Sequence, residues 1–406
     1  MTTMGWLTSV SAGGFVMSTT LEALIDMENP GFLFTRWQAT LVTILFLLMA
    51  VWFNTRGHAL LPKIDTVSLL LHMAGFALTL LPLAVLAPKN SISDVMSKFT
   101  ESGGWNSIGL SSLVGQVAIL FCFQGSDGVV YISEEVRDAS TVIPRCMIYS
   151  YLLNGFMGFV MLVTMLLCIS DLDSTIHSPA PFVTVFSATG YPTLALILTL
   201  ILCVLNLGGN ITALTATSRE MWAFARDNGL PFARWLSHVN PHSQIPVHAI
   251  LLTSGLAIAL CTINLASSIA FNIIISANLV ALLSVYMISI GCVLLRRLRR
   301  QPLPQARWSL GRWGLPVNAF AFVYAGVALV FSCFPVEAHI TAETANWAPL
   351  ILAVVLGAAL ALFFLHGRSR YEGPSVLVQK AGEGGGHGVA GGGYDDEERE
   401  HLTAAL

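Results

Sequence analysis

Long apolar stretches recur along the whole chain and are separated by short polar segments. Ten windows carry few charges and are close to the roughly 20 residues that a helix needs to cross a bilayer. They lie at 4–25, 36–53, 65–87, 110–132, 146–169, 190–216, 246–265, 268–295, 314–335 and 347–366. This pattern predicts an all-α integral membrane protein with about ten transmembrane helices.

The composition supports a membrane protein. Of 406 residues, 55% are hydrophobic and 11% are charged, whereas soluble domains carry about a quarter charged residues. The mean hydropathy is +0.72. The seven cysteines lie nearly all inside or at the ends of the apolar windows, without a CxxC pair or a His cluster. Disulfide and zinc sites are therefore disfavoured, and we expect no cofactor and no metal.

The positive charges alternate with the predicted helices. Of the 20 Lys and Arg residues, all but Arg36, Lys89 and Lys98 fall on one side when successive loops are assigned to alternate sides. The positive-inside rule makes the side that carries these basic loops cytosolic. We therefore expect both termini in the cytosol, and the plasma membrane as the location, with vacuolar or other internal membranes as alternatives.

The chain changes character near Glu372. Residues 372–406 are rich in glycine and acidic side chains and offer no apolar face to bury. We predict a membrane domain at 1–371 and a disordered cytosolic tail at 372–406. An inert tail is favoured over a regulatory one.

The apolar window at 110–132 contains an acid, Asp127, beside glycines. Gly125 and Gly128 flank Ser126 and Asp127, with Gln124 just before them, and glycine weakens a helix. A break here exposes backbone N–H and C=O groups at membrane depth, which is tolerated where protein or a water-filled cavity satisfies them. Broken helices form the substrate sites of many transporters. The residues alone leave two interpretations equally open: a binding site, or a packing contact with a buried Asp127.

Two motifs carry a resemblance to a known family. The first comprises Phe123-x-Gly125-x-Asp127, Glu134-Glu135-Val136-Arg137-Asp138 and Ile143-Pro144-Arg145. It resembles the sixth-helix signature of the amino acid–polyamine–organocation (APC) transporters. The second, Ser218-Arg219 with Trp222-Ala223-Phe224-Ala225-Arg226-Asp227-Asn228-Gly229-Leu230-Pro231, resembles the cytosolic hairpin after the family's eighth helix. The chain is most similar to the fungal permeases for amino acids, 4-aminobutyrate and choline.

The resemblance implies a fold and a starting point. Family members have twelve helices and a LeuT-like core of two inverted five-helix repeats, in which broken helices one and six hold the substrate. The similarity runs from near Trp6 to about Arg370 and begins at the family's third helix. We therefore expect this chain to hold family helices 3–12 and to lack the first two, through a gene-model error in preference to a genuine truncation.

The resemblance also suggests which residues bind substrate. The candidates are Phe123, Gln124, Gly125, Ser126, Asp127, Gly128, Asn210 and Asn278. Ser9, Ser11, Asn206 and Asn272 lie on segments that resemble helices lining the family's substrate path. Polar residues in membrane helices also hold helices together, and packing is the default interpretation for each. Asn210 and Asn278 are the better candidates for the path.

His72 is the candidate for proton coupling. It lies where some bacterial relatives carry a fifth-helix lysine, and histidine titrates near neutral pH. A buried, hydrogen-bonded histidine is a slightly favoured alternative. At the cytosolic end, Glu134 and Glu135 are candidates for gate ion pairs with Arg219 and Arg226, against the alternative of solvated interfacial charges.

The leading functional hypothesis is proton-coupled or exchange transport of an amino acid, 4-aminobutyrate, choline or a related amine by alternating access. The partners expected are this substrate, membrane lipids and protons, and no nucleic acid. The alternative is a transport-inactive or regulatory membrane protein. An enzyme is disfavoured because Asp127 and His72 are isolated and far apart in the sequence, and an ion channel lacks a recognisable filter.

Overall fold

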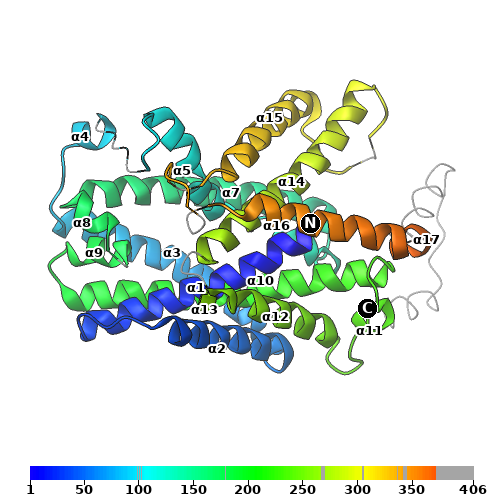
Figure 1. Ribbon diagram of the computed structural model, residues 1–406, viewed down its shortest axis with the longest axis horizontal. Coiled ribbons are helices and arrows are strands. Elements are labelled where there is room, and N and C mark those ends of the chain that lie inside the picture. The colour runs from blue at the N-terminus through cyan, green and yellow to red at the C-terminus, as the bar shows by residue number, and fades with distance from the viewer. Residues whose placement is uncertain are drawn as a thin grey trace.

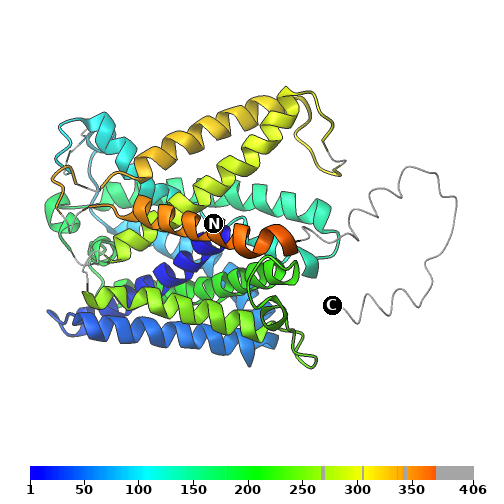
Figure 2. The same cartoon turned by 45° about the vertical axis from the view of Figure 1, so that its right-hand side comes forward.

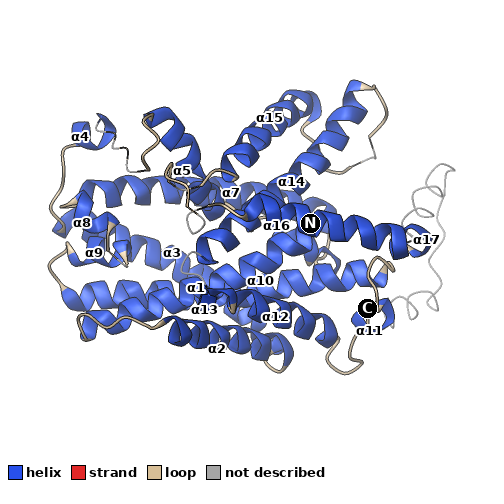
Figure 3. Cartoon of the chain, viewed as in Figure 1, coloured by secondary structure: helices blue, strands red, loops and turns tan. Residues whose placement is uncertain are grey.

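Helices provide all the regular secondary structure in the part of the chain that the structure describes (Figure 3). The structure is a computed structural model, and it describes residues 1–371 except 98, 100, 102, 179, 267–269, 304–305, 336 and 342–344. The all-α prediction is confirmed. The predicted tail at 372–406 lies outside the described residues.

Ten of the helices form the bundle (Figure 1). The long ones are α1 (Thr2–Glu28), α2 (Arg36–Thr55), α3 (Leu61–Leu86), α5 (Ile108–Cys122), α7 (Ala139–Cys168), α10 (Pro192–Arg226), α12 (Val247–Cys261), α14 (Ala270–Leu298), α15 (Gly314–Ser332) and α16 (Ala348–Leu362). The short connecting helices are η1 (His58–Leu60), α4 (Ile92–Ser97), α6 (Gly128–Tyr131), η2 (Ser133–Glu135), α8 (Leu172–Ile176), α9 (Pro181–Ser187), α11 (Ala233–Leu236), α13 (Ile263–Ala266), η3 (Gly311–Trp313), η4 (Phe363–Gly367) and α17 (Arg368–Arg370).

Within the described residues, eight helical stretches are long and apolar enough to cross a membrane. They coincide with eight of the ten predicted windows. The window at 4–25 became α1, and the window at 110–132 became α5 and α6 with a break between them. The break that the sequence analysis predicted near Gly125 and Gly128 is therefore present, and the window 110–132 is not one continuous helix.

Helix α1 runs through the centre of the bundle, and it is less apolar than the other long helices except α10. It packs against α10, α14, α2 and α12. Its buried polar side chains bond to neighbours: Ser11 donates to the Ala257 carbonyl at 3.3 Å, and Ser18 donates to the Ala39 carbonyl at 3.1 Å. A central helix contacts protein instead of lipid, so it tolerates hydroxyl side chains that a peripheral helix avoids.

The main hydrophobic core joins α1, α2, α10, α12 and the first turns of α14. Val10 of α1, Leu47 of α2, Ile211 of α10 and Ile250 of α12 are almost completely buried in one cluster. Helices α14 and α15 lean away from this core, on the side opposite α2, in both views (Figures 1 and 2). The core therefore fixes α1 against α10, which are the two helices that support the site.

Local signals set several helix boundaries. Thr35 and Gln38 form a capping box at the start of α2, and Pro192 stands in the first turn of α10, where its missing N–H costs nothing. Helix α10 continues to Arg226, ten residues beyond the predicted window. This extension brings the second sequence motif onto the same helix as Asn210.

Candidate functional site

The helix break lies between α5 and α6. Helix α5 ends at Cys122, and helical structure resumes for one turn at Gly128. Gly125 has a φ of +106°, a conformation that side chains with a Cβ rarely adopt. Gly128 is buried, and a Cβ there would stand 2.8 Å from Trp6 Cη2. Both glycines are thus needed for the backbone path, one for its angle and one for its closeness to α1.

A cavity of about 1040 Å³ lies beside the break. Its walls come from α1, α3, the α5–α6 segment, α7 and α10. Gln124, Gly125, Gly128, Asn210 and His72 of the predicted residues line it. The structure therefore brings candidates from three separate stretches of sequence to one space.

Two amide side chains at this cavity have atoms without a protein partner among the described residues. Both amide atoms of Gln124 are shielded from solvent and accept or donate no hydrogen bond. Asn210 is 4% exposed, and its Nδ2 donates to the Val10 carbonyl at 3.0 Å while its Oδ1 has no donor. Buried polar atoms are normally paired, so these unpaired atoms mark a stretch of the cavity wall where hydrogen-bond partners are missing.

Asp127 faces away from the cavity, into an aromatic cage. It is 8% exposed, and its Oδ2 accepts from Trp6 Nε1 at 3.3 Å and from the Tyr131 hydroxyl at 3.4 Å. Trp6 and Tyr131 meet edge to face with ring centroids 5.7 Å apart. Asp127 therefore ties the break to α1, and it is in a position to orient the cavity wall without lining it.

Other predicted residues also lie outside the cavity lining. Asn278 is fully buried and donates to the Gly5 carbonyl and to Ser9 Oγ, so it joins α14 to α1. Phe123 stacks on Tyr151 of α7 with centroids 6.0 Å apart. Ser126, which lies next to Asp127 in the chain, is half-buried.

The other candidates for the substrate path have different positions. Ser9 and Asn206 line the cavity, and Ser11 is buried against α12. The side chain of Asn272 lies outside the described part.

The four predicted gate residues form two ion pairs. Arg219 Nε lies 2.9 Å from Glu135 Oε1, and both residues line the cavity at one end. Arg226 makes a two-point contact with Glu134, with both N···O distances at 2.9 Å. The pairs connect η2 to α10, which are the two elements that carry the sequence motifs.

The sequence analysis did not single out two acids that the structure places at or near the site. Asp65 lines the cavity and accepts from the Thr212 hydroxyl at 2.8 Å; its spacing of seven residues from His72 places both on one face of α3. Glu220 lies on the extension of α10 beyond the predicted window, and it interacts electrostatically with Asp127. The expectation that Asp127 is isolated is therefore wrong. No cluster of three potential metal ligands occurs among the described residues.

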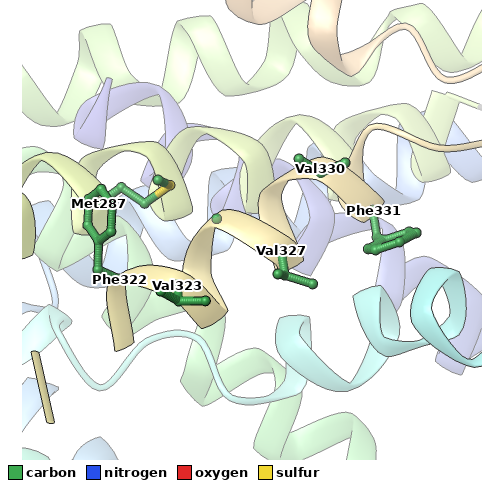
Figure 4. Close-up of a pocket in the computed structure, with 7 residues that line it drawn as sticks. Met287, Phe322, Val323, Val327, Val330 and Phe331 are labelled. Atoms are coloured by element: carbon green, nitrogen blue, oxygen red, sulfur yellow. The ribbon is translucent and has the colours of Figure 1, made fainter. Parts of the chain in front are cut away.

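A second, smaller cavity has a different character. It measures about 380 Å³ and lies between α14 and α15, lined by Met287, Phe322, Val323, Gly326, Val327, Val330 and Phe331 (Figure 4). None of these side chains carries a charge or an amide. The cavity beside the break is thus the one equipped to bind a polar solute.

Comparison with known proteins identifies the family. A model of the amino acid permease family matches residues 1–356. A Macrophomina phaseolina protein named as an amino acid/polyamine transporter is 29% identical over 351 residues, covering 85% of this chain and 76% of its own length. The choline transporter of Saccharomyces cerevisiae is 27% identical over 83% of this chain. Amino-acid permease 2 of Neurospora crassa is 29% identical over 81% of this chain.

The matched region covers only part of the last two relatives. This chain spans 60% of the length of the choline transporter and 61% of that of amino-acid permease 2. The family model nevertheless covers most of the chain. The chain therefore belongs to the amino acid permease family, a family of multi-pass membrane transporters with the LeuT-like fold and not of enzymes.

Proposed function

We propose that this protein moves an amino acid or a related amine, such as 4-aminobutyrate or choline, across a membrane by alternating access. The observation that carries the proposal is the cavity beside the helix break, whose wall includes Gln124 and Asn210, two residues with unpartnered amide atoms. Carboxylate and ammonium groups are the complementary partners of such amides. The names of the related proteins, which include an amino-acid permease and a choline transporter, support the same substrate class.

The proposed substrate site consists of the segment from Phe123 to Gly128 together with Asn210. Asn278 belongs to the site as a supporting residue outside the cavity lining. Gln124, Gly125 and Gly128 contact the substrate directly because they line the cavity. Asp127 acts as a positioning residue through Trp6 and Tyr131. Asn278 acts in the same way, since it holds the cavity-lining residue Ser9.

Uptake by the purified chain in proteoliposomes tests the proposal. Labelled amino acids, 4-aminobutyrate and choline are offered in turn, and we expect saturable uptake of one class. Gln124→Leu removes the amide while nearly preserving its size, and it is expected to weaken the apparent affinity for that substrate. Absence of uptake by wild-type protein that reaches the membrane would favour the transport-inactive or regulatory alternative.

We propose His72 as a proton-coupling residue of this transport. It lines the cavity from α3, and imidazole titrates near neutral pH. His72→Gln is expected to flatten the dependence of the uptake rate on pH, because glutamine cannot exchange a proton in the cavity wall. His177→Gln serves as the control, because His177 is exposed and directly follows the short helix α8. A pH–uptake profile of His72→Gln identical to that of wild type would rule out the role.

The pairs Glu135–Arg219 and Glu134–Arg226 are the proposed cytosolic gate. Their rupture and re-formation would accompany movement of η2 against α10 in the transport cycle. The Glu134–Arg226 pair is partly exposed, at 46% and 40%, so it contributes about 0.2–1 kcal/mol. Such a small energy suits a contact that must break in every cycle.

Charge reversal tests the gate. Glu134→Arg places two cations together, and we expect uptake to fall about two- to five-fold, in line with about 0.5–1 kcal/mol. The exchanged pair Glu134→Arg with Arg226→Glu is expected to recover most of the rate. Arg307→Glu is the matched control. Arg307 pairs with the exposed Asp138 at 2.7 Å, so this substitution places two acids together outside the proposed gate. Equal losses in the single and exchanged variants would contradict a gate made by this pair.

The proposed orientation has both ends of the chain in the cytosol and the protein in the plasma membrane. The support is the concentration of Lys and Arg in alternate loops. Epitope tags placed at each end should be reached by antibody only after the plasma membrane is permeabilised. Labelling of intact cells at either tag would overturn this orientation.

A further inference from the structure

Glu220 is a carboxyl group inside the bundle that makes no ion pair within 4.0 Å among the described residues. Its Oε1 accepts from the Thr3 hydroxyl of α1 at 3.1 Å. Its Oε2 is shielded from solvent and has no hydrogen bond among the described residues. The adjacent Arg219 turns away to Glu135. A carboxylate in this position costs more free energy than a neutral carboxyl.

Asp127 is the second carboxyl at the same place. It is more than nine-tenths buried, and its Oδ1 has no hydrogen-bond partner within the described chain. Thr3 and Trp6, one helical turn apart on α1, hold Glu220 and Asp127 respectively. Tyr131 interacts electrostatically with both carboxyl groups. Helices α1, α6 and α10 thus meet at a pair of acids.

The titratable groups around the two acids are three phenols and one amino group. Tyr286 of α14 and Tyr131 of α6 interact with Asp127, and Tyr151 of α7 interacts with Tyr286. The amino group of Met1 faces Glu220. Neither acid has an ion pair within 4.0 Å in the described chain. Because Glu220 and Asp127 contact α1 at Thr3 and Trp6, one turn apart, ionisation of one acid opposes ionisation of the other.

The donors decide where the proton resides. Asp127 accepts from an indole N–H and a phenol O–H, and hydrogen bonds to the charged form favour that form. Glu220 accepts from one hydroxyl and keeps Oε2 unpaired. Glu220, which has fewer donors around it, is therefore the acid better suited to hold a proton.

We propose that Asp127 and Glu220 form a proton-binding site whose proton couples to transport. The inference rests on the proposed function, and it adds a coupling residue that the sequence analysis did not contain. Movement of α6 against α1 and α10 changes the surroundings of both acids. Glu220 then releases its proton to water, leaving the carboxylate, and takes a proton from water on the other side, so the only bond exchanged is O–H.

The experiment compares wild type, Glu220→Gln and Glu220→Asp in proteoliposomes. Gln resembles the protonated glutamic acid but cannot release a proton. We expect Glu220→Gln to keep the wild-type melting temperature. It should also keep the wild-type rate of substrate exchange when substrate concentrations are equal on both sides. Substrate accumulation driven by a pH gradient should fall at least tenfold. Glu220→Asp should retain pH-driven accumulation. Wild-type accumulation and pH profile in Glu220→Gln would overturn the inference.

A spectroscopic readout separates this inference from the proposed function. Infrared difference spectra across a pH titration report the C=O band of a protonated carboxyl group. We expect a titrating band in wild type and in His72→Gln that is lost in Glu220→Gln. If wild type transports nothing, the proposed function fails, yet the band still supports the proton site. A band unchanged in Glu220→Gln would reject the site even if transport is normal.

Discussion

Replacing Asp127 by alanine is expected to reduce uptake at least tenfold while the protein still reaches the membrane. The change leaves the Trp6 indole and the Tyr131 hydroxyl without their shared acceptor. A buried donor left unpaired costs about 1–3 kcal/mol, and 1.4 kcal/mol corresponds to a factor of ten. The helix break loses its attachment to α1, so Gln124 no longer holds its place at the cavity. Initial uptake rates, corrected for the amount of protein at the membrane, measure the effect.

Asp127→Asn serves as the matched variant. Its amide oxygen can still accept from Trp6 and Tyr131, but the carboxylate charge is gone. We expect Asp127→Asn to melt close to wild type and to retain substrate exchange better than alanine does. Asp138→Asn, at an exposed carboxyl paired with Arg307, controls for loss of a charge outside the site. Normal uptake by a well-expressed Asp127→Ala protein would remove Asp127 from the site altogether.

The second large effect is expected from Gly13→Val. Gly13 lies where α1 crosses α10, and a Cβ there would overlap the Asn210 amide nitrogen. That nitrogen donates to the Val10 carbonyl at 3.0 Å, so the added side chain must push Asn210 out of its position. Overpacking of this kind costs about 1–3 kcal/mol. We expect a melting temperature lower by several degrees and a loss of most uptake, because Asn210 lines the cavity.

Gly158→Val is the control for this substitution. Gly158 lies in the middle of α7, and a Cβ there meets nothing within 4 Å. The same change of glycine to valine in a membrane helix should therefore leave melting and uptake close to wild type. Comparable losses in both variants would mean that helix propensity, and not the α1–α10 contact, causes the defect.

Much of the fold could be predicted from the sequence because the signals are local. An apolar window of about 20 residues requires a helix in lipid whatever its neighbours are, and eight windows match the helical spans of the described residues. The break at Gly125 was visible for the same reason, since glycine acts on its own backbone. The predicted end of the window at 216 failed because apolarity stops there while the helix continues to Arg226.

The site could be predicted only in part. The motif residues Gln124, Gly125 and Gly128 do line the cavity, as does Asn210. Asp127, the most conspicuous residue in the sequence, turns towards Trp6 instead. Asn278 does not line the cavity but donates a hydrogen bond to the cavity-lining residue Ser9. Which face of a broken segment meets a cavity depends on the helices packed around it, and periodicity cannot describe an unwound stretch.

The sequence by itself determined the class of this protein: its apolar windows require a helical membrane bundle, and its two motifs point to the amino acid permease family, to which it belongs. Only the tertiary structure decided which polar groups meet. Trp6 and Asp127 are 121 residues apart, and Asn278 and Gly5 are 273 apart. Such contacts arise from the packing of α1, α6 and α14, because helix-to-helix register is set by side chains on several helices at once.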